Sequence, residues 1–231
     1  MLASVKADPV VRCVAATRRF GVEPASVTAL SEVSCTVEPG AQIVITGPSG
    51  SGKSTLLNLM AGLDMPTSGH IEWPAIGSSD SLRPGPVAVV FQGPSLVRTL
   101  TVLENVALAR VLDGDEVDEA TSSAMRSLES LGLEEVADKL PDEISGGQAQ
   151  RVAVARALAG RPRLILADEP TGQLDRSSAT AVIEALRASA REAGAALVVT
   201  THDPLVAEHF AARWAMADGI LTEMEAPAWA C

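Results

Sequence analysis

A glycine-rich stretch at positions 47–55, GPSGSGKST, has the residue types and spacing of a phosphate-binding loop. It matches G-x-x-x-x-G-K-[ST], in which glycines let consecutive backbone N–H groups converge on phosphate oxygens. We expect Lys53 to contact the β- and γ-phosphates of a nucleotide, and the Ser54 hydroxyl to bind Mg²⁺. An apolar run before the stretch and helical spacing after it favour this interpretation over a structural glycine turn. The loop residues expected to contact the nucleotide are Gly47, Pro48, Ser49, Gly50, Ser51, Gly52, Lys53, Ser54 and Thr55.

Two carboxylates follow another apolar run, in LILADEP at 164–170. Asp168 ends this expected strand, at the edge where open α/β sheets bind ligands, and we expect it to hold Mg²⁺, partly through water. Glu169 is then free to polarise an attacking water molecule. Adjacent acids are usually a solvated pair, but their place after a strand in a chain with a phosphate loop favours catalysis. His202 follows the strand ALVVT, and we expect it to contact the γ-phosphate and orient the water, although a lone histidine is more often without a chemical role.

A second glycine pair occurs in ISGGQAQR at 144–151. Ser145 and Gln148 have the spacing of a capping box, so the stretch predicts the start of a helix. Gly146 and Gly147 each cost such a helix about 1 kcal/mol relative to alanine. Bare N–H groups at a helix start also bind anions, so the sequence indicates a second phosphate-binding surface. A simple helix cap is the alternative, and local sequence leaves open whether the two surfaces face different nucleotides.

Strand and helix patterns alternate in both flanks of the chain, while helical patterns fill about 95–143. They predict an α/β fold with a mostly parallel sheet, interrupted by an inserted helical block. We expect one domain over 1–231, with its core at about 9–92 and 155–223 and the helical sub-domain at about 93–154. The expected strands are 11–16, 33–38, 41–46, 69–73, 87–91, 163–167, 196–200 and a pair within 214–221.

The composition limits the classes of partner. The 231 residues carry a formal net charge of −11, which argues against nucleic acid as a main partner. Cys13, Cys35 and Cys231 lack C-x-x-C spacing, so a reducing cytosolic setting fits best, with ordinary thiols. The N-terminus lacks the apolar core of a secretory signal, and no apolar run approaches the roughly 20 residues of a membrane span. A role at a membrane would therefore need a separate partner chain.

The ordered motifs resemble those of the ATP-binding subunits of ABC transporters, across nearly the whole chain. The motifs are GPSGSGKST, Gln92 after VAVVF, ISGGQ, LILADEP, GQLD at 172–175 and His202. This resemblance implies the ABC ATPase fold, in which a P-loop NTPase core with a mostly parallel sheet carries an N-terminal antiparallel β portion and an inserted helical sub-domain. It implies ATP as the substrate, Mg²⁺ as the cofactor, and two subunits that sandwich two ATP molecules head to tail. It also implies binding in trans: Ser145, Gly146, Gly147, Gln148 and Asp175 of one copy would meet the ATP held by the other.

Finer features are similar to the macrolide-export and lipoprotein-release subfamily, which pairs with four-helix permeases. By this resemblance Phe20 stands where an aromatic ring stacks on adenine, and Gln92 binds ATP, senses Mg²⁺ and couples to the permease. The segment 74–86 departs from the subfamily because it is shorter and richer in proline and glycine. Gln173 and Ile144 are milder variations. The tail EAPAWAC gives no interpretation.

The leading hypothesis is an ATP-hydrolysing subunit on the inner face of the cell membrane, bound there through an integral membrane permease and powering export, lipoprotein release or mechanical signalling. The alternative is a soluble ABC-type regulatory ATPase that acts in DNA repair or translation. Chromosome-maintenance relatives need long coiled coils and translation factors need two fused domains, and neither feature occurs here. A GTPase or a small-molecule kinase is disfavoured because no N-K-x-D motif is present and neither class explains SGGQ.

Overall fold

The computed structural model describes residues 7–22, 24–83 and 85–224. Its centre is a six-stranded sheet in the order β5-β6-β7-β3-β8-β9. The first five strands run parallel, and only β9 pairs antiparallel, with β8. The strands are β3 (Gln42–Thr46), β5 (Val87–Val90), β6 (Leu164–Asp168), β7 (Ala196–Thr201), β8 (Ala212–Ala217) and β9 (Ile220–Met224). The expected mostly parallel sheet is confirmed.

A second sheet of three antiparallel strands, in the order β2-β1-β4, packs beside the central one. Its strands are β1 (Val11–Phe20), β2 (Val27–Val37) and β4 (Ser68–Glu72). This confirms the antiparallel β portion expected near the N-terminus. Cys13 and Cys35 lie opposite each other on β1 and β2, and both are buried free thiols. Cys231 and the tail 225–231 lie outside the described residues.

Alternate residues of the central strands point into two different cores, as the two-residue period of a strand requires. Ile43, Ile45 and Val198 face a core shared with the antiparallel sheet and with α1 (Lys53–Met60). Their neighbours on the strands face α5 (Arg176–Ala193) and the other helices. Both faces of the sheet are thus covered, which explains why strands such as LILA and ALVV are continuously apolar.

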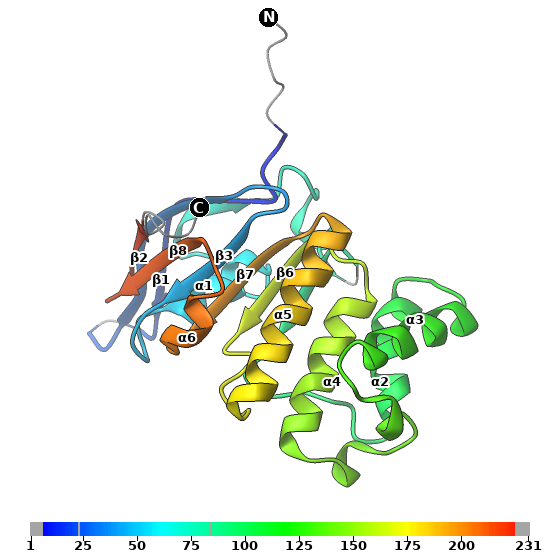
Figure 1. Ribbon diagram of the computed structural model, residues 1–231. Coiled ribbons are helices and arrows are strands. Elements are labelled where there is room, and N and C mark those ends of the chain that lie inside the picture. The colour runs from blue at the N-terminus through cyan, green and yellow to red at the C-terminus, as the bar shows by residue number, and fades with distance from the viewer. Residues whose placement is uncertain (1–6, 23, 84, 225–231) are drawn as a thin grey trace, which may run out of the picture.

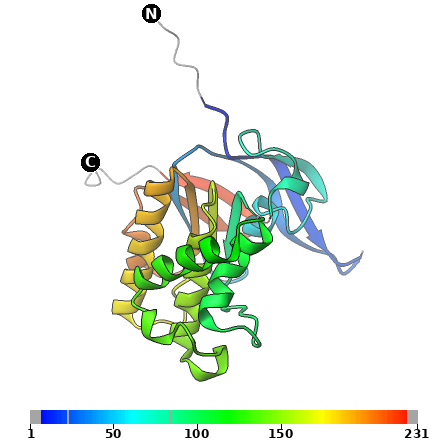
Figure 2. The ribbon, with the colours of Figure 1, turned by 90° about the vertical axis from the view of Figure 1, so that its right-hand side faces the viewer.

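The helices α2 (Val102–Leu112), α3 (Val117–Glu129) and α4 (Gly146–Ala159) pack together. Figures 1 and 2 show them on the side of the molecule away from β1 and β2, with α4 lying next to α5. The division expected between residues 154 and 155 falls inside α4, which runs unbroken through it. Short 3₁₀ turns at Ser79–Ser81, Glu134–Val136 and Pro141–Glu143 and the small helix α6 (Pro204–Ala207) complete the chain. None of the helices among the described residues is long and apolar enough to cross a bilayer.

Local sequence signals set several helix ends. Thr101 and Glu104 form a capping box at α2, and Ser145 and Gln148 form one at α4, as their spacing predicts. Gly194 ends α5 with φ 63°, the left-handed conformation that glycine adopts without strain. These ends fix where each helix starts and stops, and therefore which loops reach the edge of the sheet.

Asn105 is the polar centre of the helical block. It is fully buried, and its side chain bonds the backbone at Val97, Leu100 and Thr101. We expect Asn105→Ala to lower the free energy of unfolding by about 2–4 kcal/mol, because it leaves buried backbone groups unpaired. Urea unfolding followed by circular dichroism measures this, with the half-exposed Val111→Ala on the same helix as control, expected within about 0.5 kcal/mol of the parent. If Asn105→Ala lowered the free energy of unfolding no more than Val111→Ala, the stabilising role given to the Asn105 hydrogen bonds would be contradicted.

Candidate nucleotide-binding site

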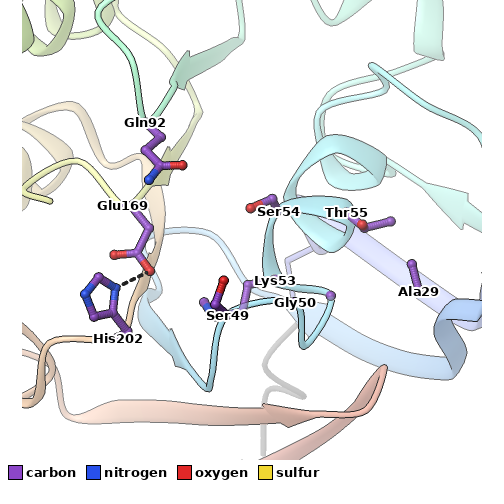
Figure 3. A pocket seen from close by; sticks show the side chains of 10 residues that line it. Ala29, Ser49, Gly50, Lys53, Ser54, Thr55, Gln92, Glu169 and His202 are labelled. Atoms are coloured by element: carbon purple, nitrogen blue, oxygen red, sulfur yellow. Dashed lines mark hydrogen bonds and ion pairs between the residues drawn. The ribbon is translucent and has the colours of Figure 1, made fainter.

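A cavity of about 400 Å³ opens at the carboxyl edge of the parallel strands. Figure 3 shows its two walls. The phosphate loop and the start of α1 form one wall, with Ala29 of β2 beyond them, and Gln92, Glu169 and His202 form the other. These three follow β5, β6 and β7, so the parallel topology brings them to one edge, as expected from their places in the sequence. The lining residues are Ala29, Ser49, Gly50, Gly52, Lys53, Ser54, Thr55, Gln92, Glu169 and His202.

The loop has a backbone that only glycine can follow at two places. Gly52 has φ 105°, and a Cβ there would lie 2.4 Å from the carbonyl oxygen of Ala29. A Cβ on Gly47 would lie 2.1 Å from the carbonyl oxygen of Met216. Gly52 is also the N-cap of α1 and makes no side-chain cap, so no side chain of this residue blocks the first N–H groups of the helix.

Lys53 and Ser51 complete the loop. Lys53 is buried, and its Nζ donates to the carbonyl oxygens of Gly47 (2.8 Å) and Pro48 (2.9 Å). These bonds hold the Lys53 ammonium group against the loop, on the side where phosphate oxygens would lie. The Ser51 hydroxyl is buried and has no hydrogen-bond partner among the described residues.

Glu169 and His202 form a hydrogen-bonded pair. His202 Nδ1 lies 2.9 Å from Glu169 Oε1, with the histidine 69% exposed and the glutamate 12% exposed on their side chains. Glu169 has φ 46°, a left-handed conformation that is costly for a residue with a Cβ. Such strain is found where a backbone must aim a side chain, here toward the cavity (Figure 3).

Asp168 is the last residue of β6 and does not line the cavity itself. Its Oδ1 accepts a hydrogen bond of 2.5 Å from the Thr200 hydroxyl. With Ser54 and Gln92 it offers a hydroxyl, an amide and a carboxylate, which are the hard oxygen donors that Mg²⁺ prefers. The described residues contain no cluster of three or more His, Cys, Asp or Glu side chains able to hold a metal. A magnesium ion here would therefore share its coordination between few protein groups, water and phosphate oxygens, as this ion commonly does.

Several expected residues lie away from the cavity. Phe20 ends β1, is 43% exposed, and has the Arg18 guanidinium 4.6 Å from its ring centroid. Asp175 caps α5, and the hydrogen bonds that Ser177 and Ser178 donate to it hold its pKa well below the usual value.

The glycine pair at the start of α4 also lies away from the cavity. None of the four residues 145–148 lines it. Among the described residues, a Cβ on Gly146 would meet nothing within 4 Å, and one on Gly147 would touch only Leu174, at 3.4 Å. Packing within this chain therefore does not require a glycine at position 146.

Sequence reasoning missed three residues next to the site. Thr200 bonds to Asp168 and Glu169, Gln150 donates to the Phe91 carbonyl (3.1 Å), and Arg156 donates to the Ser95 carbonyl (3.0 Å). Thr200 had a signal, because it is a hydroxyl that follows four apolar residues in a buried strand. Gln150 and Arg156 gave none, since polar residues on a helix are most often solvated.

Comparisons with known proteins show the family to which this chain is similar. The family profile described as ABC transporter matches residues 30–172. The lipoprotein-releasing system ATP-binding protein LolD of Bordetella pertussis is 42% identical over 191 residues, covering 80% of this chain and 83% of LolD.

Solved structures give the same result. The ATP-binding cassette MJ0796, in a dimeric post-hydrolysis state bound to ADP and Pi, matches with a TM-score of 0.85 and 35% identity, over 93% of this chain and 98% of that one. cbiO1 from Clostridium perfringens, part of the ABC transporter complex cbiONQ, matches with a TM-score of 0.80 and 27% identity, over 94% and 88%. The chain belongs to the ABC transporter family, as an ATP-binding subunit that hydrolyses ATP.

Proposed function

We propose that the cavity is one half of a composite ATP site, and that a second copy of the chain completes it. The observation that carries this proposal is the Glu169–His202 pair, which faces the phosphate loop across the cavity while the SGGQ stretch lies elsewhere. A catalytic carboxylate and a phosphate cradle thus occur together, and the second anion-binding surface is left for another nucleotide.

In this proposal the loop holds the phosphates. The N–H groups of residues 47–55 and the start of α1 bind the phosphate oxygens, and Lys53 turns from its carbonyl partners to the β- and γ-phosphates. Ser54, Gln92 and Asp168 would hold Mg²⁺, which neutralises charge on the phosphates when bound. Phe20, exposed at the end of β1, remains a proposed adenine platform. Its stacked Arg18 would share that role.

Glu169 is the proposed general base. Its carboxylate accepts the proton of the attacking water as the water oxygen bonds to the γ-phosphorus, and ADP leaves with the electrons of the broken P–O bond. His202 holds that carboxylate in place and lies exposed at the mouth of the cavity, where it can contact the γ-phosphate.

Replacing the base tests this role. Glu169→Gln keeps the shape and removes the basic oxygen, so we expect steady-state hydrolysis to fall by about two to four orders of magnitude while ATP binding persists. Phosphate release and equilibrium ATP binding measure the two effects, with Glu192→Gln on the exposed face of α5 as the matched control. Normal turnover in Glu169→Gln would refute the assignment.

The proposed second copy explains the glycine pair of α4. The Ser145 hydroxyl and the first N–H groups of the helix form an anion-binding surface, and open space around Gly146 lets another molecule approach the backbone closely. The similar cassette MJ0796 is dimeric in both of its structures. In a head-to-tail dimer, residues 145–148 and Asp175 of one copy would contact the ATP held by the other.

A groove between β5 and the helical block is the proposed docking surface for a membrane permease. This second cavity of about 430 Å³ is lined mainly by apolar residues, with Arg83 and Arg156 among them. Burial lowers the pKa of both arginines. They give the groove positive charge, although the chain as a whole has a net charge of −11. The surface therefore suits an amphipathic segment with acidic residues. The apolar lining residues are Val87, Ala88, Val89, Leu108, Ala109, Leu112 and Ala157.

The groove is joined to the ATP site. Arg156, which lines the groove, donates to the carbonyls of Pro94 (3.4 Å) and Ser95 (3.0 Å), and Gln150 holds the Phe91 carbonyl. These bonds hold the segment that carries Gln92 to α4. A permease segment in the groove would thus sense nucleotide through Gln92 and would hold the subunit on the inner face of the membrane. Export, lipoprotein release and mechanical signalling all remain compatible with this arrangement.

Docking can be tested at Leu112, which is 64% exposed at the groove. We expect Leu112→Asp to weaken binding to the membrane protein that co-purifies with the parent chain by roughly tenfold or more, because it places a charge among apolar and acidic partner groups. Co-purification from detergent-solubilised membranes measures binding. Val117→Asp is the matched control, because Val117 is 62% exposed and lies outside the groove.

Both variants should keep the melting temperature of the parent, because both positions are exposed. Equal binding by the two variants would argue against the groove. A chain that binds no membrane protein would favour the soluble regulatory ATPase instead.

A further inference from the structure

Thr200 is a buried hydroxyl that contacts both acids of the site. It lies on β7, is fully buried, and pairs in the parallel register with Asp168 of β6. Its Oγ1 donates to Asp168 Oδ1 at 2.5 Å and accepts from the backbone N–H of Glu169 at 3.1 Å. The Thr200 carbonyl oxygen also accepts from that N–H, at 3.1 Å.

The two bonds use the hydroxyl in both of its roles. It has one hydrogen, which goes to the Asp168 carboxylate, and its lone pairs receive the Glu169 N–H. This arrangement fixes the rotation of the Asp168 carboxylate and requires that carboxylate to be an acceptor. It also anchors the peptide unit that begins the left-handed turn at Glu169, with φ 46°.

Packing alone does not call for a hydroxyl at this position. The preceding residues of β7, Leu197, Val198 and Val199, are buried and apolar, and valine has the same shape as threonine. A buried hydroxyl in such a strand costs free energy unless its hydrogen bonds are made. Here they are made to the two carboxylate residues of the site, and Thr200 does not line the cavity.

We infer that Thr200 is a positioning residue, which aims Asp168 at the magnesium ion and Glu169 at the attacking water. This inference rests on the roles proposed above for Asp168 and Glu169. Thr200 does not line the cavity, so it acts through these two residues.

The experiment compares Thr200→Val, which keeps the shape and removes the hydroxyl, with Thr200→Ser, which keeps the hydroxyl. Mn²⁺ serves as the probe ion, and its binding to the full chain saturated with a non-hydrolysable ATP analogue is measured by electron paramagnetic resonance. We expect Thr200→Val to weaken Mn²⁺ binding and to lower kcat, each by roughly tenfold, while ATP affinity in EDTA stays at the parent value. Thr200→Ser should restore both quantities, and Thr200→Ala replaces the valine variant if that one fails to fold.

Two controls separate the possible failures. Thr17→Val removes another buried hydroxyl, which accepts a hydrogen bond from the Glu32 N–H rather than from a residue of the site. It should change the melting temperature without changing Mn²⁺ binding. Asp168→Asn should abolish the tight Mn²⁺ site. If Asp168→Asn has no effect, the proposed role of Asp168 fails. If Asp168→Asn loses Mn²⁺ while Thr200→Val matches the parent, or if Thr200→Ser is as poor as Thr200→Val, the inference about Thr200 is overturned.

Discussion

The parallel register of β5, β6, β7 and β3 is the constraint on which the site depends. Because these strands run in one direction, the loop after β3 and the residues after the other three strands emerge at the same edge. The register that places Asp168 opposite Thr200 also places Glu169 and His202 within hydrogen-bond distance. The apolar faces on both sides of the sheet hold this edge rigid. Groups far apart in sequence therefore face one cavity.

The same topology places residues 145–148 away from the cavity, which is why we propose that a second copy completes the site. The helical block lies between β5 and β6 in the chain, so SGGQ begins α4, which packs beside α5 on the side of the molecule away from β1 and β2 (Figure 1). One chain thus has a cradle and a base at one place and a bare helix start at another. A conformational change driven by ATP needs a state that binds ATP more tightly, and a dimer closed around two nucleotides would provide it. The proposed docking groove, joined through Arg156 to the segment that carries Gln92, would give that closure a route to a partner.

Sequence patterns predicted much of this arrangement, for identifiable reasons. The central parallel strands were predicted because buried parallel strands are apolar throughout, whereas the antiparallel β1 and β2 extend beyond the predicted 11–16 and 33–38. The helix ends at Thr101, Ser145 and Gly194 were predicted because caps have strict residue preferences. The P-loop, Glu169 and His202 were expected together because each follows a strand. The hydroxyl of Thr200 stands out in an apolar strand, but its partners, like those of Gln150 and Arg156, were not predictable, since contacts depend on which residues of distant elements meet. The expected boundary between the sub-domains, at residues 154 and 155, falls inside α4. A helix gives no local sequence signal of which neighbours it packs against, so the sequence could not place this boundary.

The most direct test of the composite site is sedimentation velocity at saturating ATP. The measurement compares Glu169→Gln with the same variant carrying Ser145→Arg, or carrying Ser130→Arg on the exposed end of α3 as a charge control. The account predicts that ATP makes the Glu169→Gln parent and its Ser130→Arg derivative dimeric, while the Ser145→Arg derivative binds ATP yet stays monomeric. A Ser145→Arg chain that dimerises as well as its parent would contradict it, as would a parent that remains monomeric in ATP, alone and beside its permease.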